Sequence, residues 1–470
     1  MCNFVSLMMQ NPCYSALYTS NVSDSRIQKR IEFSMSKMLT LGSSIVNRLS
    51  SLHTEKIGFY RMLSNTRFSH EDLLEGSFKL CVANMNTNHV LAIQDTTEFN
   101  YSGIKSKLGS DDPDVGPTGC SKIAGFFCHP MLVVNPISNA LIGFSSVDIY
   151  NRTWGQANKK ERKYLDIEKK ESYRWIGSSI ETKELLPDNV TVTIIGDREN
   201  DIYEDFVRVP DERTNLLIRS RCDRRIVGEH KKLYNLLENT DVAGSIEVEI
   251  AGQKNRKKRI AVIDVKFTKA KICAPSNLKV SQKEIEIYII EATENPSSVP
   301  TGESGISWKL LTTHKIENLD KATECINWYK KRWLIEELFR VIKTKGFEIE
   351  SSQLGDGFKL KKLLAMTLEV ALQVMRLKLS LNDENQKADN LFNGNEIRFL
   401  EKVNKKIEGQ TQKQKNPYDD KTMAWVAWII ARIGGWTGYK SQGPPGYITI
   451  KNGLDKYHQQ YEGYLLFSDD

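Results

Sequence analysis

The chain has 470 residues, of which 40% are hydrophobic and 27% charged, so it is long enough to bury a core in two or three domains. Its 29 glycines and 13 prolines exclude wholesale disorder and collagen-like repeats, and its 8 cysteines form no CxxC pair, which excludes a zinc ribbon or a dithiol redox motif. The formal net charge of +7 only hints at a polyanionic partner.

The N-terminal sequence MCNFVSLMMQ lacks the basic region of a secretory signal. No later segment reaches the roughly 18 apolar residues of a membrane span, and the nearest rival, residues 363–381, carries Glu369 and Arg376. We therefore expect a soluble cytoplasmic protein with reduced thiols and no membrane partner.

Two helical patterns open the chain, at residues 23–42 and 53–65. The first has Ser and Asp capping signals, apolar residues near helical spacing and a closing Gly42. Residues 1–75 are predicted to form a helical DNA-binding module, although an ordinary helical cap on the next domain would have the same pattern.

Short apolar runs rich in β-branched residues follow. Strands are predicted at residues 89–95, 126–134, 140–150, 190–197 and 214–220. A charged helical segment follows the third run and another follows the fourth, which predicts a mixed α/β sheet over residues 76–220. In the loop after the fourth strand, Glu199 and Asp201 are expected to cap the next helix.

Residues 221–305 change to a β-rich and basic texture, with strands expected at 244–250, 258–267 and 284–292. Within residues 251–272, eight Lys or Arg face one Asp. This stretch favours contact with nucleic acid, although a solvated hairpin has the same composition. The strand expected at 307–313 again has the apolar pattern of a core strand. Residues 221–305 are therefore predicted to be an insertion that interrupts the sheet.

The last third is predicted to be mainly helical. One long helix is expected at 321–346 and another at 359–381, which completes the second part of the core at 306–380. Residues 381–470 are predicted to form a C-terminal module with an apolar helix at 422–436, a turn-rich stretch at 438–454 and a helical tail. The apolar helix could serve a dimer interface or the core of the module.

The helix at 321–346 carries a one-sided polar stripe. Its members, spaced by 3, 4, 4 and 3 residues, are Tyr329, Arg332, Glu336, Arg340 and Lys343. At 100° per residue they fall within an arc of roughly 80°. A solvated row of salt bridges would have the same spacing, so the stripe alone does not define a site.

Two further acids end apolar strands, Asp95 in LAIQD and Asp197 in TVTIIGD. Strand ends of a mixed sheet converge, and Glu336 on a neighbouring helix would complete an oxygen-rich site. Mg²⁺ prefers such carboxylates, and Mn²⁺ is expected to substitute for it. A metal site of this kind suits phosphoryl transfer, with the cations of the stripe on the flanking phosphates.

The spacing of Tyr329, Arg332, Glu336 and Lys343 resembles the YREK signature of DDE transposases of the bacterial insertion-sequence IS-four family. The segments LAIQDTTEFNYSG and IIGDRENDIYED are similar to the first and second acidic motifs of that family. The resemblance runs over nearly the whole chain. It implies an RNase H-like core interrupted by a β-rich insertion, cut-and-paste transposition of DNA, and synapsis of two transposon ends by a homodimer.

Carried over residue by residue, the resemblance makes Asp95, Asp197 and Glu336 the metal ligands. Tyr329, Arg332 and Lys343 would hold the backbone of the transposon end, and Arg340 occupies a second basic site with altered hydrogen-bond geometry. The family excises DNA through a hairpin with a flipped base, and Trp308 stands where an aromatic residue stacks on that base. Trp333 and Arg219 are further DNA-binding candidates, although Arg219 could equally be a surface strand end.

Two other interpretations are compatible with these motifs. One is a catalytically silent derivative that still binds DNA ends, and the other is an RNase H-like nuclease without joining activity. The intact triad argues against the first, and Trp308 together with the C-terminal module argues against the second. His129, one of 7 histidines, is expected to be a core histidine and not a metal ligand.

Overall fold

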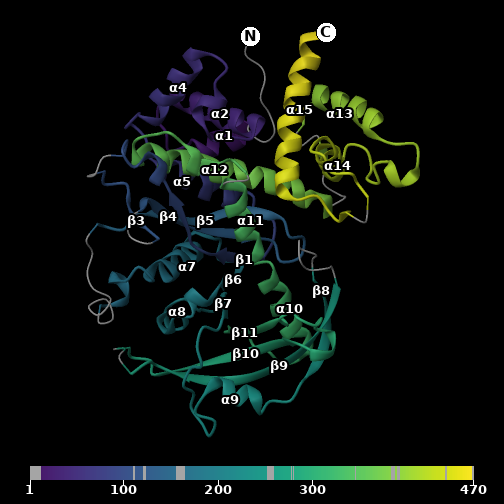
Figure 1. The fold of residues 1–470 in the computed structure, drawn as a ribbon. Helices are drawn as coiled ribbons and strands as arrows, with labels where there is room; N and C mark the ends of the chain where they lie inside the picture. Colours follow the sequence, from purple (N-terminus) through teal and green to yellow (C-terminus); the bar gives the residue numbers. More distant parts are fainter. Residues whose placement is uncertain are drawn as a thin grey trace.

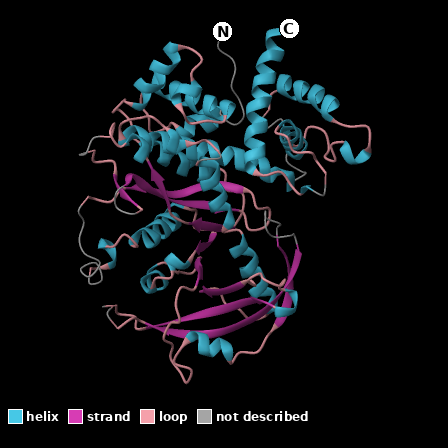
Figure 2. Cartoon of the chain, viewed as in Figure 1, coloured by secondary structure: helices cyan, strands magenta, loops and turns pink. Residues whose placement is uncertain are grey.

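The computed structural model describes residues 12–108, 112–119, 123–154, 165–250, 259–276, 278, 280–343, 346–382, 387–388, 392–439 and 442–467. Residues 251–258, which hold half of the basic stretch, lie outside the described residues. The fold is mixed α/β: one large sheet lies among helices (Figures 1 and 2), as the sequence predicted.

The sheet has eleven strands in the described part of the chain. The path across it is β2-β4-β1-β6-β7-β11-β10-β9-β8, and β3 and β5 also pair with β4. The strands are β1 (His89–Gln94), β2 (Thr97–Asn100), β3 (Gly116–Thr118), β4 (Ile123–Val134), β5 (Leu141–Tyr150), β6 (Thr191–Gly196), β7 (Thr214–Arg219), β8 (Gly244–Ile250), β9 (Arg259–Cys273), β10 (Glu284–Glu294) and β11 (Ser307–Thr312). Among the described strands, the parallel pairings are β1 with β6 and β6 with β7, and the other pairings are antiparallel.

The helices fall into N-terminal, middle and C-terminal groups along the chain. They are α1 (Pro12–Tyr18), α2 (Ser25–Leu41), α3 (Val46–Leu49), α4 (His53–Leu63), α5 (His70–Ala83), α7 (Tyr173–Leu185), α8 (Tyr203–Arg208), α9 (Leu233–Glu238), α10 (Leu319–Lys330), α11 (Trp333–Ile342), α12 (Gly357–Leu379), α13 (Gly394–Ile407), α14 (Met423–Ile433) and α15 (Tyr447–Phe467). The capping signals around α2 are real: Asp24 accepts a hydrogen bond from the backbone N–H of Arg26, and Gly42 closes the helix in the left-handed region.

Helices cover both faces of the central strands, with α5 and α12 on one face and α7 and α8 on the other (Figure 1). Side chains of a strand alternate between the two faces, so each strand contributes side chains to two cores. Leu91 and Ile93 of β1 pack in the core that contains α11 and α12, whereas Val90 and Ala92 pack in the core that contains α7 and α8. This alternation also decides which way the residues beyond each strand point.

The strands of the β-rich segment 221–305 join the central sheet. β11 pairs with β7 on one side and with β10 on the other, and β9 and β8 extend the sheet from there. The chain thus passes from β7 to β8 at the far edge of the sheet and comes back strand by strand until β11 pairs with β7.

Two parts of the helical prediction were wrong. The helix expected at 321–346 is broken into α10 and α11 at Lys331 and Arg332, so Tyr329 and Glu336 lie on different helices. The segment expected to be turn-rich at 438–454 is helical from Tyr447 onward, because α15 begins there. Neither Glu199 nor Asp201 caps a helix: the 3-10 turn Arg198–Asn200 is capped by Asp197, and Asp201 pairs with the buried Arg224.

None of the helices in the described residues combines the length and the apolar character needed to cross a membrane.

Candidate active site

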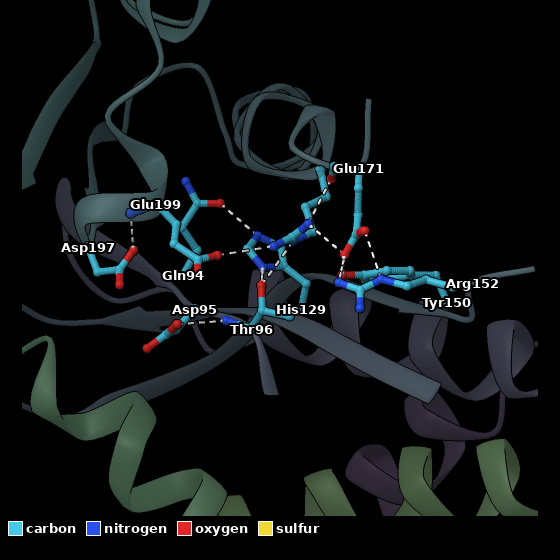
Figure 3. A network of polar contacts seen from close by, with 10 residues as sticks. Gln94, Asp95, Thr96, His129, Tyr150, Arg152, Glu171, Asp197 and Glu199 are labelled. Atoms are coloured by element: carbon cyan, nitrogen blue, oxygen red, sulfur yellow. Dashed lines mark hydrogen bonds and ion pairs between the residues drawn. The ribbon is translucent and has the colours of Figure 1, made fainter. Parts of the chain in front are cut away.

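Asp95 and Asp197 follow the parallel neighbours β1 and β6. Ile93 lies opposite Ile195 in the register of these strands, and each aspartate stands two residues beyond that pair. Ile93 and Ile195 both face the core that contains α11, and the alternation of side chains directs the two aspartates toward the same face. Figure 3 shows the two carboxylates at neighbouring strand ends.

The third acid of the predicted triad arrives on α11, and it is joined to the first by Arg332. One guanidinium nitrogen of Arg332 lies 3.1 Å from Oδ2 of Asp95, and the other pairs with Glu336. The fork-shaped guanidinium suits such double recognition. We call this arrangement the Arg332 bridge; it places a positive charge between two of the three carboxylates.

The surroundings of Asp95 perturb its pKa. Its pKa is raised to about 6, first by burial and then by the charge of Asp197, with Glu336 adding to the effect and Arg332 opposing it. The rise shows that the three acids lie within electrostatic reach of one another. A cation at this point would relieve their repulsion.

The donor set fits Mg²⁺ or Mn²⁺, since it consists of three carboxylates at the end of a sheet. In the described part of the chain, however, no three acidic, imidazole or thiol groups converge closely enough to surround a metal ion as they stand. Arg332 supplies a positive charge between Asp95 and Glu336 in this state.

Three of the predicted DNA-binding residues gather beside the triad. The ring of Trp308 meets the ring of Tyr329 edge to face, with centroids 5.9 Å apart. Tyr329 is buried, which raises its pKa, and Arg219 and Asp197 are among the charges that act on it. Arg219 donates a hydrogen bond to the carbonyl of Ser307 at 3.3 Å, so it is anchored beside β11.

Three more of the predicted DNA-binding residues, Trp333, Arg340 and Lys343, lie on α11 or directly after it. Lys343 donates to the carbonyl of Glu98 at 2.6 Å, against β2. Arg340 pairs with Glu337 at 3.0 Å and not with Glu336, and the indole of Trp333 donates to the same Glu337 at 2.8 Å. The expectation of one continuous stripe around Glu336 was therefore wrong, because the break at Arg332 and the ion pair with Glu337 divide it. Trp333 remains 48% exposed, and the guanidinium of Arg340 lies over its ring, 5.8 Å from the centroid.

A polar network lies behind the two aspartates, on the opposite face of the sheet (Figure 3). His129 is fully buried, as expected for a core histidine, and its Nδ1 and Nε2 contact Thr96 Oγ1 at 2.8 Å and Gln94 Oε1 at 3.0 Å. Burial holds the pKa of His129 well below its usual range, so the ring is neutral.

Thr96 and Arg174 of this network are not among the residues predicted from the sequence. Thr96 directly follows Asp95, and adjacency to a strand-end acid was the only available signal for it. Arg174 comes from the start of α7, 79 positions after Asp95 in the sequence, and no spacing pattern connects the two.

No protein-family model matches the chain. The likeness to a transposase family thus rests on the motifs in the sequence.

Proposed function

We propose that the chain is a metal-dependent DNA-cleaving and strand-joining enzyme of the DDE transposase type, with an RNase H-like catalytic core. The observation that carries the proposal is that Asp95 and Asp197 stand at the ends of two parallel neighbouring strands, while Arg332 pairs with both Asp95 and Glu336. Mg²⁺ or Mn²⁺ held by these carboxylates would supply Lewis-acid activation of the attacking oxygen and stabilisation of the leaving one.

The surrounding residues suit a DNA backbone. Arg332 would exchange its carboxylate partners for a phosphate, which a guanidinium binds in the same forked geometry. Arg219 and Lys343 lie on either side of the triad along the sheet, where they would hold flanking phosphates. Both hydrogen bonds are made to neutral carbonyl groups.

Trp308 would stack on an extruded base. Its ring is half-buried and rests edge-on against Tyr329, so one part of the indole stays accessible beside the triad. Excision through a hairpin, which needs such an extruded base, is the reaction we propose for this site. The α13–α15 module would support the homodimer that pairs two transposon ends, within the bacterial cytoplasm and in association with the nucleoid.

The test is cleavage of a labelled duplex that carries the terminal inverted repeat flanking the coding sequence, in Mg²⁺. We expect hairpin and joined products from the intact protein and none from Glu336→Gln. The matched control is Glu324→Gln on α10, which removes an exposed acid paired with Lys321 and should leave the products unchanged.

Two outcomes would contradict the proposal. Binding of the repeat without cleavage by the intact protein would identify a silent derivative. Nicking without a hairpin or joined product would identify an RNase H-like nuclease without joining activity.

A further inference from the structure

Arg174 connects the turns that follow β1 and β6. Its Nε donates to Thr96 Oγ1 at 3.0 Å, and one of its terminal nitrogens lies 3.4 Å from the Glu199 carboxylate. The other terminal nitrogen donates to the carbonyl of Glu171 at 2.8 Å, which ties the guanidinium to the start of α7. The side chain is only 10% exposed, so its fork is held between the two turns.

Two of these partners, Thr96 and Glu199, orient the two aspartates in the same way. The backbone N–H of Thr96 donates to Oδ1 of Asp95 at 2.8 Å, and the backbone N–H of Glu199 donates to Oδ1 of Asp197 at 2.7 Å. In each turn, the residue whose side chain meets Arg174 orients a carboxylate through its backbone. Arg174 therefore sits behind both acids without touching either one.

The hydroxyl of Thr96 donates to His129 and accepts from Arg174, and the neighbouring hydrogen bonds fix these directions. Ser179 donates to the carbonyl of Trp175 at 2.7 Å and accepts from the amide nitrogen of Gln94 at 3.1 Å, which turns the amide oxygen of Gln94 toward His129. Nε2 of the neutral His129 ring then carries the proton, and Nδ1 accepts from the Thr96 hydroxyl. The remaining lone pairs of Thr96 accept from Arg174.

We propose that Arg174 is a positioning residue that fixes the two strand-end turns relative to each other, so that Asp95 and Asp197 present their free oxygens to one cation. The inference rests on the proposed function, since it concerns how the metal ligands are held. Without Arg174 the two turns lose this side-chain link, and we expect the pair of carboxylates to lose its preset geometry.

The experiment measures Mn²⁺ affinity of the full-length protein without DNA, by electron paramagnetic resonance, together with the melting temperature. We expect Arg174→Met to weaken Mn²⁺ binding about tenfold, as is typical for residues that orient metal ligands. Arg174→Lys should keep little of the Mn²⁺ affinity of the intact protein, because an ammonium group cannot contact Thr96 and Glu199 at the same time. Thr96→Val, which leaves Arg174 in place, should reproduce the loss and covers the case in which Arg174→Met fails to fold.

The matched control is Arg152→Met. Arg152 binds the same Glu171 through two hydrogen bonds of 2.9 and 2.7 Å, and among the described residues it makes no hydrogen bond with the turns after β1 and β6. Unchanged Mn²⁺ affinity in a folded Arg174→Met protein, or an equal loss in Arg152→Met, would overturn the inference. A separate Asp197→Asn titration distinguishes the two proposals: if it matches the intact protein, no metal binds at the triad and the proposed function falls as well.

Discussion

The guanidinium of Arg332 lies 3.1 Å from the carboxylate of Asp95, at the junction where α10 ends and α11 begins. The same guanidinium pairs with Glu336 one turn along α11. An arginine bound in this way competes with any cation for two of the three acids. A DNA phosphate that draws Arg332 away would free both carboxylates, so DNA and metal are expected to bind cooperatively.

Arg332→Gln should therefore tighten Mn²⁺ binding in the absence of DNA. Removing one partly buried positive charge beside the acids is expected to raise the affinity about tenfold, because the Coulomb term is of the order of several kcal/mol before screening. Calorimetric titration of the DNA-free protein would measure it. Arg340→Gln is the control, since Arg340 pairs with Glu337, and an unchanged or weaker affinity in Arg332→Gln would contradict the competition.

The buried pair of Asp201 and Arg224 should contribute strongly to stability. Asp201 has a fully buried side chain, accepts from Arg224 Nε at 2.8 Å and from the backbone N–H of Arg221 at 2.7 Å, and fastens the turn beyond Asp197 to the start of the 221–305 segment. Arg224→Met leaves this charge uncompensated and should lower the free energy of unfolding by about 3 kcal/mol in denaturant titrations.

The exposed pair of Lys315 and Glu317 provides the comparison. Both side chains are more than half exposed, so Glu317→Gln should change stability by less than about 0.5 kcal/mol. Equal effects of the two substitutions would show that burial does not govern the Asp201 pair.

The raised pKa of Glu396 predicts that the stability of the C-terminal module depends on pH. Burial raises its pKa to about 7 from an ordinary 4.5, while its carboxylate accepts the backbone N–H of Asn393 at the start of α13. Because the folded pKa is the higher one, the stabilising contribution is complete below 4.5 and is lost as the pH rises toward 7.

Glu396→Gln keeps the capping box and removes this titration. The variant should match the intact protein near pH 5 and be more stable by about 2 kcal/mol near pH 8, as judged by scanning calorimetry at both pH values. Glu401→Gln on the same helix, at a partly exposed position, is the control.

Two helical glycines should respond in opposite ways to alanine. A Cβ at Gly76 of α5 would lie 1.9 Å from the carbonyl oxygen of Tyr18, so Gly76→Ala must separate α1 from α5 and should cost about 2–3 kcal/mol. A Cβ at Gly177 of α7 meets only the Tyr173 ring at 3.6 Å, and Gly177→Ala should add about 0.5–1 kcal/mol. Thermal unfolding of both variants would reveal the difference in sign.

The sequence predicted the parts of this structure that depend on local pattern. The runs ending at Asp95 and Asp197 became β1 and β6, because buried β-branched residues leave little choice at short length. The apolar pattern of 359–381 became α12, and residues 422–436 contained α14. Local pattern also placed the acids at the strand ends, and register alone then brought them together.

What the sequence could not predict depends on contacts between distant segments. The spacing of Tyr329, Arg332 and Glu336 suits one helix, yet α10 ends at Lys330 and α11 begins at Trp333, and the side chain of Arg332 between them reaches Asp95. Arg174 joins two turns from the far face of the sheet, and its role follows only from the packing of α7. In both cases a tertiary ion pair or hydrogen bond outweighs a local preference.

The return of the chain to the sheet at β11 has a kinetic consequence. Arg219 of β7 pairs with Leu310 of β11, although 90 residues of chain pass between them. Closing a loop of that length early is entropically costly, whereas the hairpins β8–β9, β9–β10 and β10–β11 are each local. We therefore expect the 221–305 segment to form its hairpins first and β11 to pair with β7 late in folding.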